Sequence, residues 1–372
     1  MFTLYKFELR KILNRKILWI TGSILLVGIL LWGIASAILP ANREILDGSV
    51  NGYEANQKER AAAEAIKGRE IDQTLIDEMR AAYEDFIFNG DAEKALPYLD
   101  VYNFMADVMG TYASQEILKV DSEVFYSHLS QQLDKNELLQ DGAPIVYNGY
   151  FDGWRQLSTI IKVLISMEVM FVAVCLSTVF TVEHTRKTDQ LILCSRYGKK
   201  KLYISKLCAG LTVGIGFTLL LSILTFAIVS VLFGLDGFNT ILQFVLLRPF
   251  NFSIGQAVLI LFALSFAGVI VVSVVSMVLS ELTKNSIATI GIITGILIIT
   301  LFVSELPAGL GILSELWYLL PSNLVSLNGA FRNTMFQGLI AYQIAPFFYF
   351  VVIVVFAVTG KIIHNRYQIS GR

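Results

Sequence analysis

Hydrophobic and polar positions alternate along this chain in long blocks, and the block lengths suit helices that cross a lipid bilayer. A helix needs about 20 predominantly apolar residues to span the hydrocarbon core. Six stretches come close to this length, and they cover residues 17–39, 157–182, 207–234, 254–280, 286–303 and 339–363. The pattern therefore predicts an all-α integral membrane protein with six transmembrane helices.

Residues 304–338 do not fit this pattern, because they are interrupted by Pro307, Gly309, Gly311 and Pro321. We expect two short interfacial or re-entrant helices there, since irregular backbone at membrane depth must be buried in protein or line a cavity. Glycines four residues apart allow spans to pack closely. Such spacing occurs twice in the apolar stretches, at Gly210 and Gly214 and at Gly291 and Gly295.

Residues 1–16 precede the first apolar stretch and read as an amphipathic helix. Their cations, which an anionic lipid surface would attract, are Lys6, Arg10, Lys11, Arg15 and Lys16. The triplet Ala35-Ser36-Ala37 resembles a signal-peptide cleavage site, but the apolar run before it is too long. A signal sequence has an apolar core of about 7–15 residues, whereas this run has 23. We therefore interpret residues 17–39 as an uncleaved first span.

Residues 40–156 are polar and long enough, at 117 residues, for a small domain with its own core. Apolar side chains recur there at helical spacing, as in Ile71, Leu75, Met79, Tyr83 and Phe86. Aspartates positioned to cap helices are Asp72, Asp91 and Asp121, and the segment is punctuated by Gly68, Gly90 and Gly110. The segment is predicted to be helical.

Composition and charge place these elements relative to a membrane. The chain is 55% hydrophobic and 16% charged, unlike an ordinary soluble domain. Residues 40–156 hold 22 acidic and 10 basic residues, whereas residues 183–206 hold seven basic residues. Lysine and arginine in short loops mark the cytoplasmic side, and long domains are exempt from this rule. We therefore expect both termini and residues 183–206 to be cytoplasmic and the acidic helical domain to be extracellular.

Two ionisable residues, Lys162 and Glu168, occur inside the second apolar stretch. Lys162 is near the outer end, where a lysine can extend its ammonium to water. An ionised acid near mid-membrane costs about 2.5–3.5 kcal/mol on insertion scales, so Glu168 should face a partner or a water-filled cavity. A structural polar contact and a pathway-lining or inter-subunit role are equally open. Ser158 has the spacing of a serine–lysine dyad with Lys162, but no other motif supports a protease.

The sequence offers little chemistry of its own. The three cysteines, Cys175, Cys194 and Cys208, lie outside the acidic segment, so no disulfide framework is available there. The histidines, His128, His184 and His364, have no metal-ligand spacing. Phosphate-binding loops and the common hydrolase and dinucleotide motifs are also missing from the sequence. We expect no catalytic site and no directly bound cofactor or metal.

The arrangement as a whole resembles the permease subunits of ABC-2 type transporters. In those proteins the first inner loop begins with Glu, continues through a Thr-x-x-Leu-Leu-Leu-like helix and a Ser/Arg turn, and ends with a Lys. Here the corresponding residues are Glu183, Thr188, Leu191-Ile192-Leu193, Ser195-Arg196 and Lys206. Lys187 replaces the usual small Gly, and Tyr197-Gly198 follows the turn without the usual Pro.

The resemblance implies that residues 1–16 form an elbow helix and that Glu183 to Arg196 form a coupling helix on an ATPase subunit. Leu191 and Ile192 would be the buried anchors, Thr188 belongs to the same motif, and Glu183, Arg186 and Arg196 would contact the rim of the ATPase groove. ATP and Mg²⁺ would be bound by two copies of a partner ATPase, beside a second or homologous permease. The implied location is the bacterial cell membrane, with no nucleic-acid partner, and the substrates are antimicrobial peptides, lipids or ions.

Three other readings remain open from the residues. The basic loop could be only a solvated, charged connection. The chain could be a membrane-anchored sensor whose acidic outer domain binds a ligand. It could also be a secondary transporter, although such proteins normally show internal repeats and more charge within the membrane.

Overall fold

The computed structural model describes residues 2–39, 50–133, 145–186, 188, 200–303, 310–336 and 338–366. In these residues the secondary structure is helical, apart from isolated β-bridges that pair Glu70 with Val146, Ile241 with Ser253 and Asn333 with Ile340. The chain divides into two compact units. The first unit comprises residues 1–29, 159–224 and 260–372, and the second comprises residues 30–158 and 225–259.

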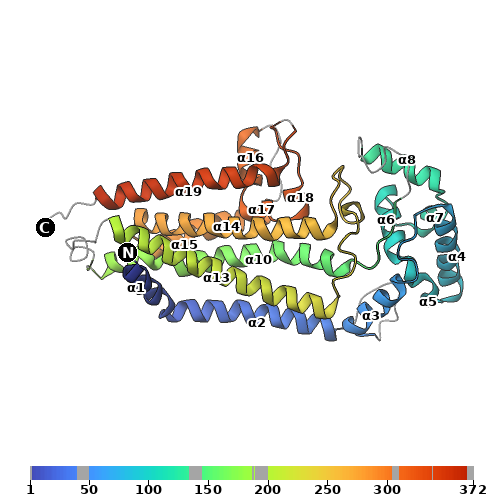
Figure 1. Ribbon diagram of the computed structural model, residues 1–372, viewed down its shortest axis with the longest axis horizontal. Coiled ribbons are helices and arrows are strands. Elements are labelled where there is room, and N and C mark those ends of the chain that lie inside the picture. The colour runs from blue at the N-terminus through green and yellow to red at the C-terminus, as the bar shows by residue number, and fades with distance from the viewer. Residues whose placement is uncertain are drawn as a thin grey trace. The chain divides into compact units, whose positions relative to one another are not determined.

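Five helical stretches of the described chain are long and apolar enough to cross a membrane (Figure 1). They are α2 (Lys16–Ile38), α10 with α11 (Asp152–Leu176 and Thr178–Thr185), α13 (Lys200–Leu232), α14 (Ile254–Thr283) and α19 (Ala341–Arg366). The sixth predicted stretch corresponds to α15 (Ser286–Phe302), which has only 17 residues. At 1.5 Å per residue it is about 25 Å long, shorter than the hydrocarbon core of about 30 Å. Five candidate spans are therefore established.

The first unit begins with α1 (Phe2–Leu13), which is separated from α2 by a two-residue break. Close contacts between α13 and α14 explain one of the two glycine pairs. A β-carbon at Gly210 would overlap the sulfur of Met277, and one at Gly214 would lie 2.7 Å from the hydroxyl of Ser273. The predicted close packing at this pair is confirmed. The pair on α15 differs, because β-carbons at Gly291 and Gly295 would meet no described atom within 4 Å.

Three short helices follow α15 in the described part of the first unit, where the sequence predicted two. They are α16 (Ile312–Tyr318), α17 (Pro321–Leu324) and α18 (Leu327–Ala330). The additional break has local causes. Pro321 starts α17, and the side chain of Ser326 accepts a hydrogen bond from the backbone N–H of Gly329 at the start of α18. An ion pair of 2.5 Å between Arg332 and the buried Glu315 holds the segment that follows against α16.

The second unit contains the helices of the acidic segment. They are α3 (Gly52–Ala63), α4 (Gln73–Asn89), α5 (Ala92–Ala95), the 3-10 turn η1 (Leu96–Tyr98), α6 (Leu99–Met109), α7 (Ser114–Ile117) and α8 (Ser122–Gln132). Asp72 caps α4 as predicted, since its side chain accepts from the N–H of Leu75 at 2.8 Å. Asp121 precedes α8 but makes no such bond, and Gln73 accepts from the N–H of Ser122 instead. Gly90 ends α4 in a left-handed conformation, with φ of 75°.

Residues 225–259, which include the connection between the predicted third and fourth spans, belong to the same compact unit. The 3-10 turn η2 (Leu242–Phe244) is buried there. The ring of Phe244 stacks on Phe104 with centroids 4.4 Å apart and also contacts Phe151 at 5.5 Å. These aromatic side chains shield the apolar turn from solvent, so the turn does not need lipid to cover it.

Candidate functional site

The residues predicted to couple the chain to an ATPase begin at the end of α11. Glu183 lies on this helix and is buried, with 7% exposure. Arg186 follows the helix and is exposed, and the N–H of Thr188 donates to the carbonyl oxygen of Glu183 at 3.1 Å. The remaining predicted coupling residues, Leu191, Ile192 and Arg196, lie outside the described residues.

Glu183 is held by two lysines from distant parts of the chain. Lys11 on α1 reaches its Oε1 atom, and Lys206 on α13 reaches its Oε2 atom, each at 2.5 Å. Both lysines therefore engage the buried carboxylate inside the first unit, and its predicted contact with an ATPase stays a prediction. Three helices, α1, α11 and α13, are joined at one carboxylate.

Lys206 is the most enclosed charge of this group, with 0% exposure. Its ammonium also donates to the backbone carbonyl of Val179 at 3.4 Å and lies 4.8 Å from the centre of the Phe180 ring. A buried ammonium requires such partners, because desolvating an ion costs several kcal/mol. The partners surround Lys206 with an acid, a carbonyl and an aromatic face.

A second buried carboxylate, Glu281 at the end of α14, contacts two histidines. Its Oε1 is 2.8 Å from Nδ1 of His364 on α19, and its Oε2 is 3.3 Å from Nε2 of His184 on α11. Tyr203 on α13 packs near His364, with ring centres 5.5 Å apart, and donates its hydroxyl hydrogen to the carbonyl of Ala357 at 3.0 Å. Four helices of the first unit therefore meet around Glu281.

The two carboxylates form one connected group. Glu183 and His184 are consecutive on α11, and the Phe180 ring lies beside both Lys206 and His364. We call the group Lys11, Glu183, His184, Lys206, Glu281 and His364 the junction cluster. In the described part of the chain no set of histidine, cysteine and acidic residues is arranged to hold a metal ion. The chemistry of the junction cluster is therefore charge pairing between helices.

The residues singled out within the second apolar stretch have different surroundings. Glu168 on α10 is 1% exposed and accepts a hydrogen bond from the hydroxyl of Ser265 on α14 at 3.4 Å. Lys162 is exposed at the protein surface. The hydroxyl of Ser158 donates to the carbonyl of Arg155 at 2.7 Å. Glu168 thus has a polar contact within this chain, and its participation in a pathway stays a prediction.

Sequence reasoning named Glu183 and Lys206 but did not pair them, and it treated His184 and His364 as separate side chains. The available signals were a lysine just before one long apolar stretch, at Lys206, and an acid just after another, at Glu183. Neither signal identifies a partner, because paired side chains can lie far apart in the sequence. Lys11 and Glu183, for example, are 172 positions apart.

A family comparison gives this arrangement its context. The sequence model of the family described as ABC-2 family transporter protein matches residues 2–355 of this chain. The chain belongs to the ABC-2 family. No curated protein and no solved structure matches it. As a family member it is the membrane subunit of an ABC-2 type transporter, a class of permease without an ATPase domain. The resemblance stated from the sequence is therefore confirmed.

Proposed function

We propose that this ABC-2 protein is the permease subunit of an ATP-driven exporter, coupled through Glu183 to Arg196 to a separate ATPase subunit. The observation that carries the proposal is the junction cluster. The segment that would touch the ATPase begins at Glu183, and the carboxylate of Glu183 is bonded to α1 and α13. ATP and Mg²⁺ bind on the ATPase, and two permeases form the translocation pathway for an antimicrobial peptide, a lipid or an ion.

The junction cluster supplies a way to transmit movement. A displacement of α11 moves Glu183 and His184 together, because both lie on that helix. Through their partners the displacement reaches α1, α13, α14 and α19. Packed helices joined by buried ion pairs shift as units rather than deform continuously. The proposed coupling therefore acts on the span bundle as a whole.

The coupling assignment is tested by substituting its predicted anchor. Fully burying one leucine side chain contributes about 1.5–3 kcal/mol, which corresponds to roughly a tenfold to hundredfold change in affinity. Leu191→Asp should release the ATPase during co-purification while the permease still inserts. Arg186→Ala, which removes an exposed charge, should change co-purification much less at physiological salt. If Leu191→Asp retains both the ATPase and transport, the segment is only a charged connection.

We further propose six spans, with α15 as the fifth, both termini in the cytoplasm and residues 40–156 outside. A helix shorter than the bilayer core is accommodated by local thinning of the membrane. The contacts of α1, the end of α11, the start of α13 and the end of α19 within the junction cluster support a common side for these segments.

This orientation is tested by labelling single cysteines in intact cells, after replacement of Cys175, Cys194 and Cys208. An impermeant thiol reagent should label Arg80→Cys, at a partly exposed position of the acidic segment, and should not label Gln190→Cys. The reverse pattern would invert the topology.

A further inference from the structure

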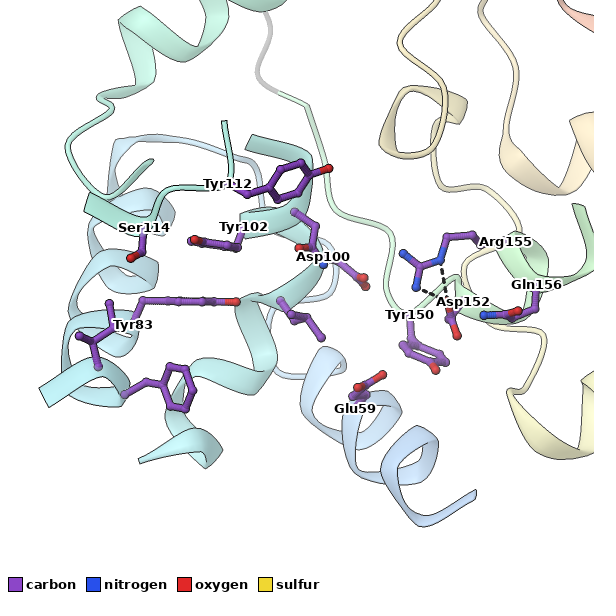
Figure 2. A pocket seen from close by; sticks show the side chains of 14 residues that line it. Glu59, Tyr83, Asp100, Tyr102, Tyr112, Ser114, Tyr150, Asp152, Arg155 and Gln156 are labelled. Atoms are coloured by element: carbon purple, nitrogen blue, oxygen red, sulfur yellow. Dashed lines mark hydrogen bonds and ion pairs between the residues drawn. The ribbon is translucent and has the colours of Figure 1, made fainter. Parts of the chain in front are cut away.

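The second unit contains a cavity of about 510 Å³ that the coupling proposal does not use. It is lined by residues from α3, α4 and α6 and by residues at or just before the starts of α7 and α10, and Figure 2 shows their side chains around a common space. Pockets for small organic ligands have volumes of about 300–1,000 Å³. The cavity is therefore large enough for a small organic molecule.

One wall of the cavity is aromatic and tightly packed. The rings of Tyr83 and Tyr102 are stacked, with centroids 4.2 Å apart and an angle of 8° between them. Phe86 meets Tyr83 edge-on, at 6.4 Å and 84°. Tyr83 is 4% exposed, so its ring is fixed by its neighbours. The face of an aromatic ring is electron-rich and attracts cations within about 6 Å.

The opposite side carries acidic groups, as Figure 2 shows for Glu59 and Asp152. Glu59 and Asp152 are buried, with 5% and 2% exposure, and Asp100 also lines the cavity. Among the described residues that line the cavity, the positively charged one is Arg155, whose Nε donates to Asp152 Oδ1 at 2.7 Å. The described part of the lining therefore holds three carboxylates and one guanidinium, an excess of acidic groups.

These features discriminate between classes of ligand. An anion would meet more carboxylates than guanidinium groups among the described lining residues, and Arg155 already pairs with Asp152. A wholly apolar molecule would bury carboxylates without offering them a charge or a hydrogen bond, which is unfavourable. A metal ion has no suitable set of ligands in the described residues. An organic cation satisfies both walls, since its charge meets the acids and its apolar body meets the rings.

We propose that this cavity binds a small organic cation, namely an amine or quaternary ammonium group attached to an apolar body. Asp100 and Glu59 provide the charge, and the stacked Tyr83 and Tyr102 provide the aromatic face. The proposal lies beyond the coupling function and does not depend on it, because binding involves only this chain.

The test is a binding titration on the purified full-length chain in a maltoside detergent, which contains no choline headgroup, with no ATPase present. The probes are choline, its uncharged isostere 3,3-dimethylbutan-1-ol, the larger cation benzyltrimethylammonium, and benzoate. We expect the two cations to bind, choline at least about tenfold more tightly than its isostere, and benzoate not to bind. Equal binding of choline and the isostere, or tighter binding of benzoate, would overturn the proposal.

Variants locate the binding in the cavity. Tyr102→Leu removes a ring face and Asp100→Asn removes a charge while leaving an oxygen for the Tyr147 hydroxyl, which donates to Asp100 at 2.6 Å. Each should weaken benzyltrimethylammonium binding by about tenfold. Tyr102→Phe keeps the stack and should bind like the parent, as should Glu84→Gln, which removes an exposed acid outside the lining.

Unfolding midpoints of all four variants identify any general loss of structure, and Tyr102→Phe keeps the test valid if Tyr102→Leu does not fold. If Asp100→Asn and Glu84→Gln weaken binding equally, the cation is attracted by overall charge and the cavity assignment is wrong.

Discussion

Removing the charge of Glu183 should destabilise the first unit by about 3 kcal/mol, near the lower end of the 3–5 kcal/mol found when one partner of a buried ion pair is removed. Glu183→Gln keeps the size of the side chain but leaves the ammonium of Lys206, at 0% exposure, without its carboxylate. Lys11 contributes less to the loss. Its side chain is 28% exposed and its ammonium already lies 3.7 Å from Glu8.

Two contacts that Lys206 keeps place the predicted loss of stability at the lower end of this range. After the substitution, Lys206 can still donate to the carbonyl of Val179 and still lies over the Phe180 ring. A cation–ring contact is worth roughly 0.5–2 kcal/mol, the upper figure applying to desolvated groups. A loss of about 3 kcal/mol corresponds to a more than hundredfold change in the unfolding equilibrium.

The assay is reversible unfolding in mixed detergent and dodecyl sulfate micelles, because heat unfolding of large proteins is often irreversible. The double variant Glu183→Gln, Lys206→Met removes both charges and should recover most of the lost stability. Glu84→Gln, at an exposed site of the second unit, is the control and should match the parent within about 0.5 kcal/mol. The reasoning is refuted if Glu183→Gln matches the control, or if the double variant is less stable than the single one.

Two further predictions concern packing and pH. Gly153→Ala should destabilise the protein by about 3 kcal/mol, because the added methyl would overlap the backbone carbonyl oxygen of Gly234. The control is Gly216→Ala, whose new β-carbon would have no atom within 4 Å. In the same unfolding assay this control should be neutral or slightly stabilising. The hydrogen bond from Arg69 lowers the pKa of Glu78. The stability that the Arg69–Glu78 pair contributes to the fold is therefore present above the ordinary glutamate pKa. It is lost as the pH falls through the lowered pKa of Glu78. Because the pair is exposed, this loss should stay below about 1 kcal/mol, and Glu78→Gln should remove that part of the pH dependence.

Local signals explain what the sequence could predict of the fold. The start of α4 at Asp72 and its end at Gly90 depend on the preferences of single residues for caps and left-handed turns, and both are present. The inclusion of residues 225–259 in the second unit had no such signal. It depends on Phe244 meeting Phe104, 140 positions earlier in the chain, and an apolar turn between two spans looks the same whether lipid or protein covers it.

The candidate site shows the same limit for charges. Counting lysines and arginines beside apolar stretches uses each one as a marker of the cytoplasmic surface, and it treated Lys11 and Lys206 alike. In the structure Lys206 is fully buried and both lysines bind Glu183. The count indicates at which end of a span a charge lies, whereas the choice of partner depends on which helices meet there. For this permease the difference matters, because a solvated Glu183 would be available to another subunit, whereas the buried Glu183 ties three of the chain's own helices to the start of the proposed coupling segment.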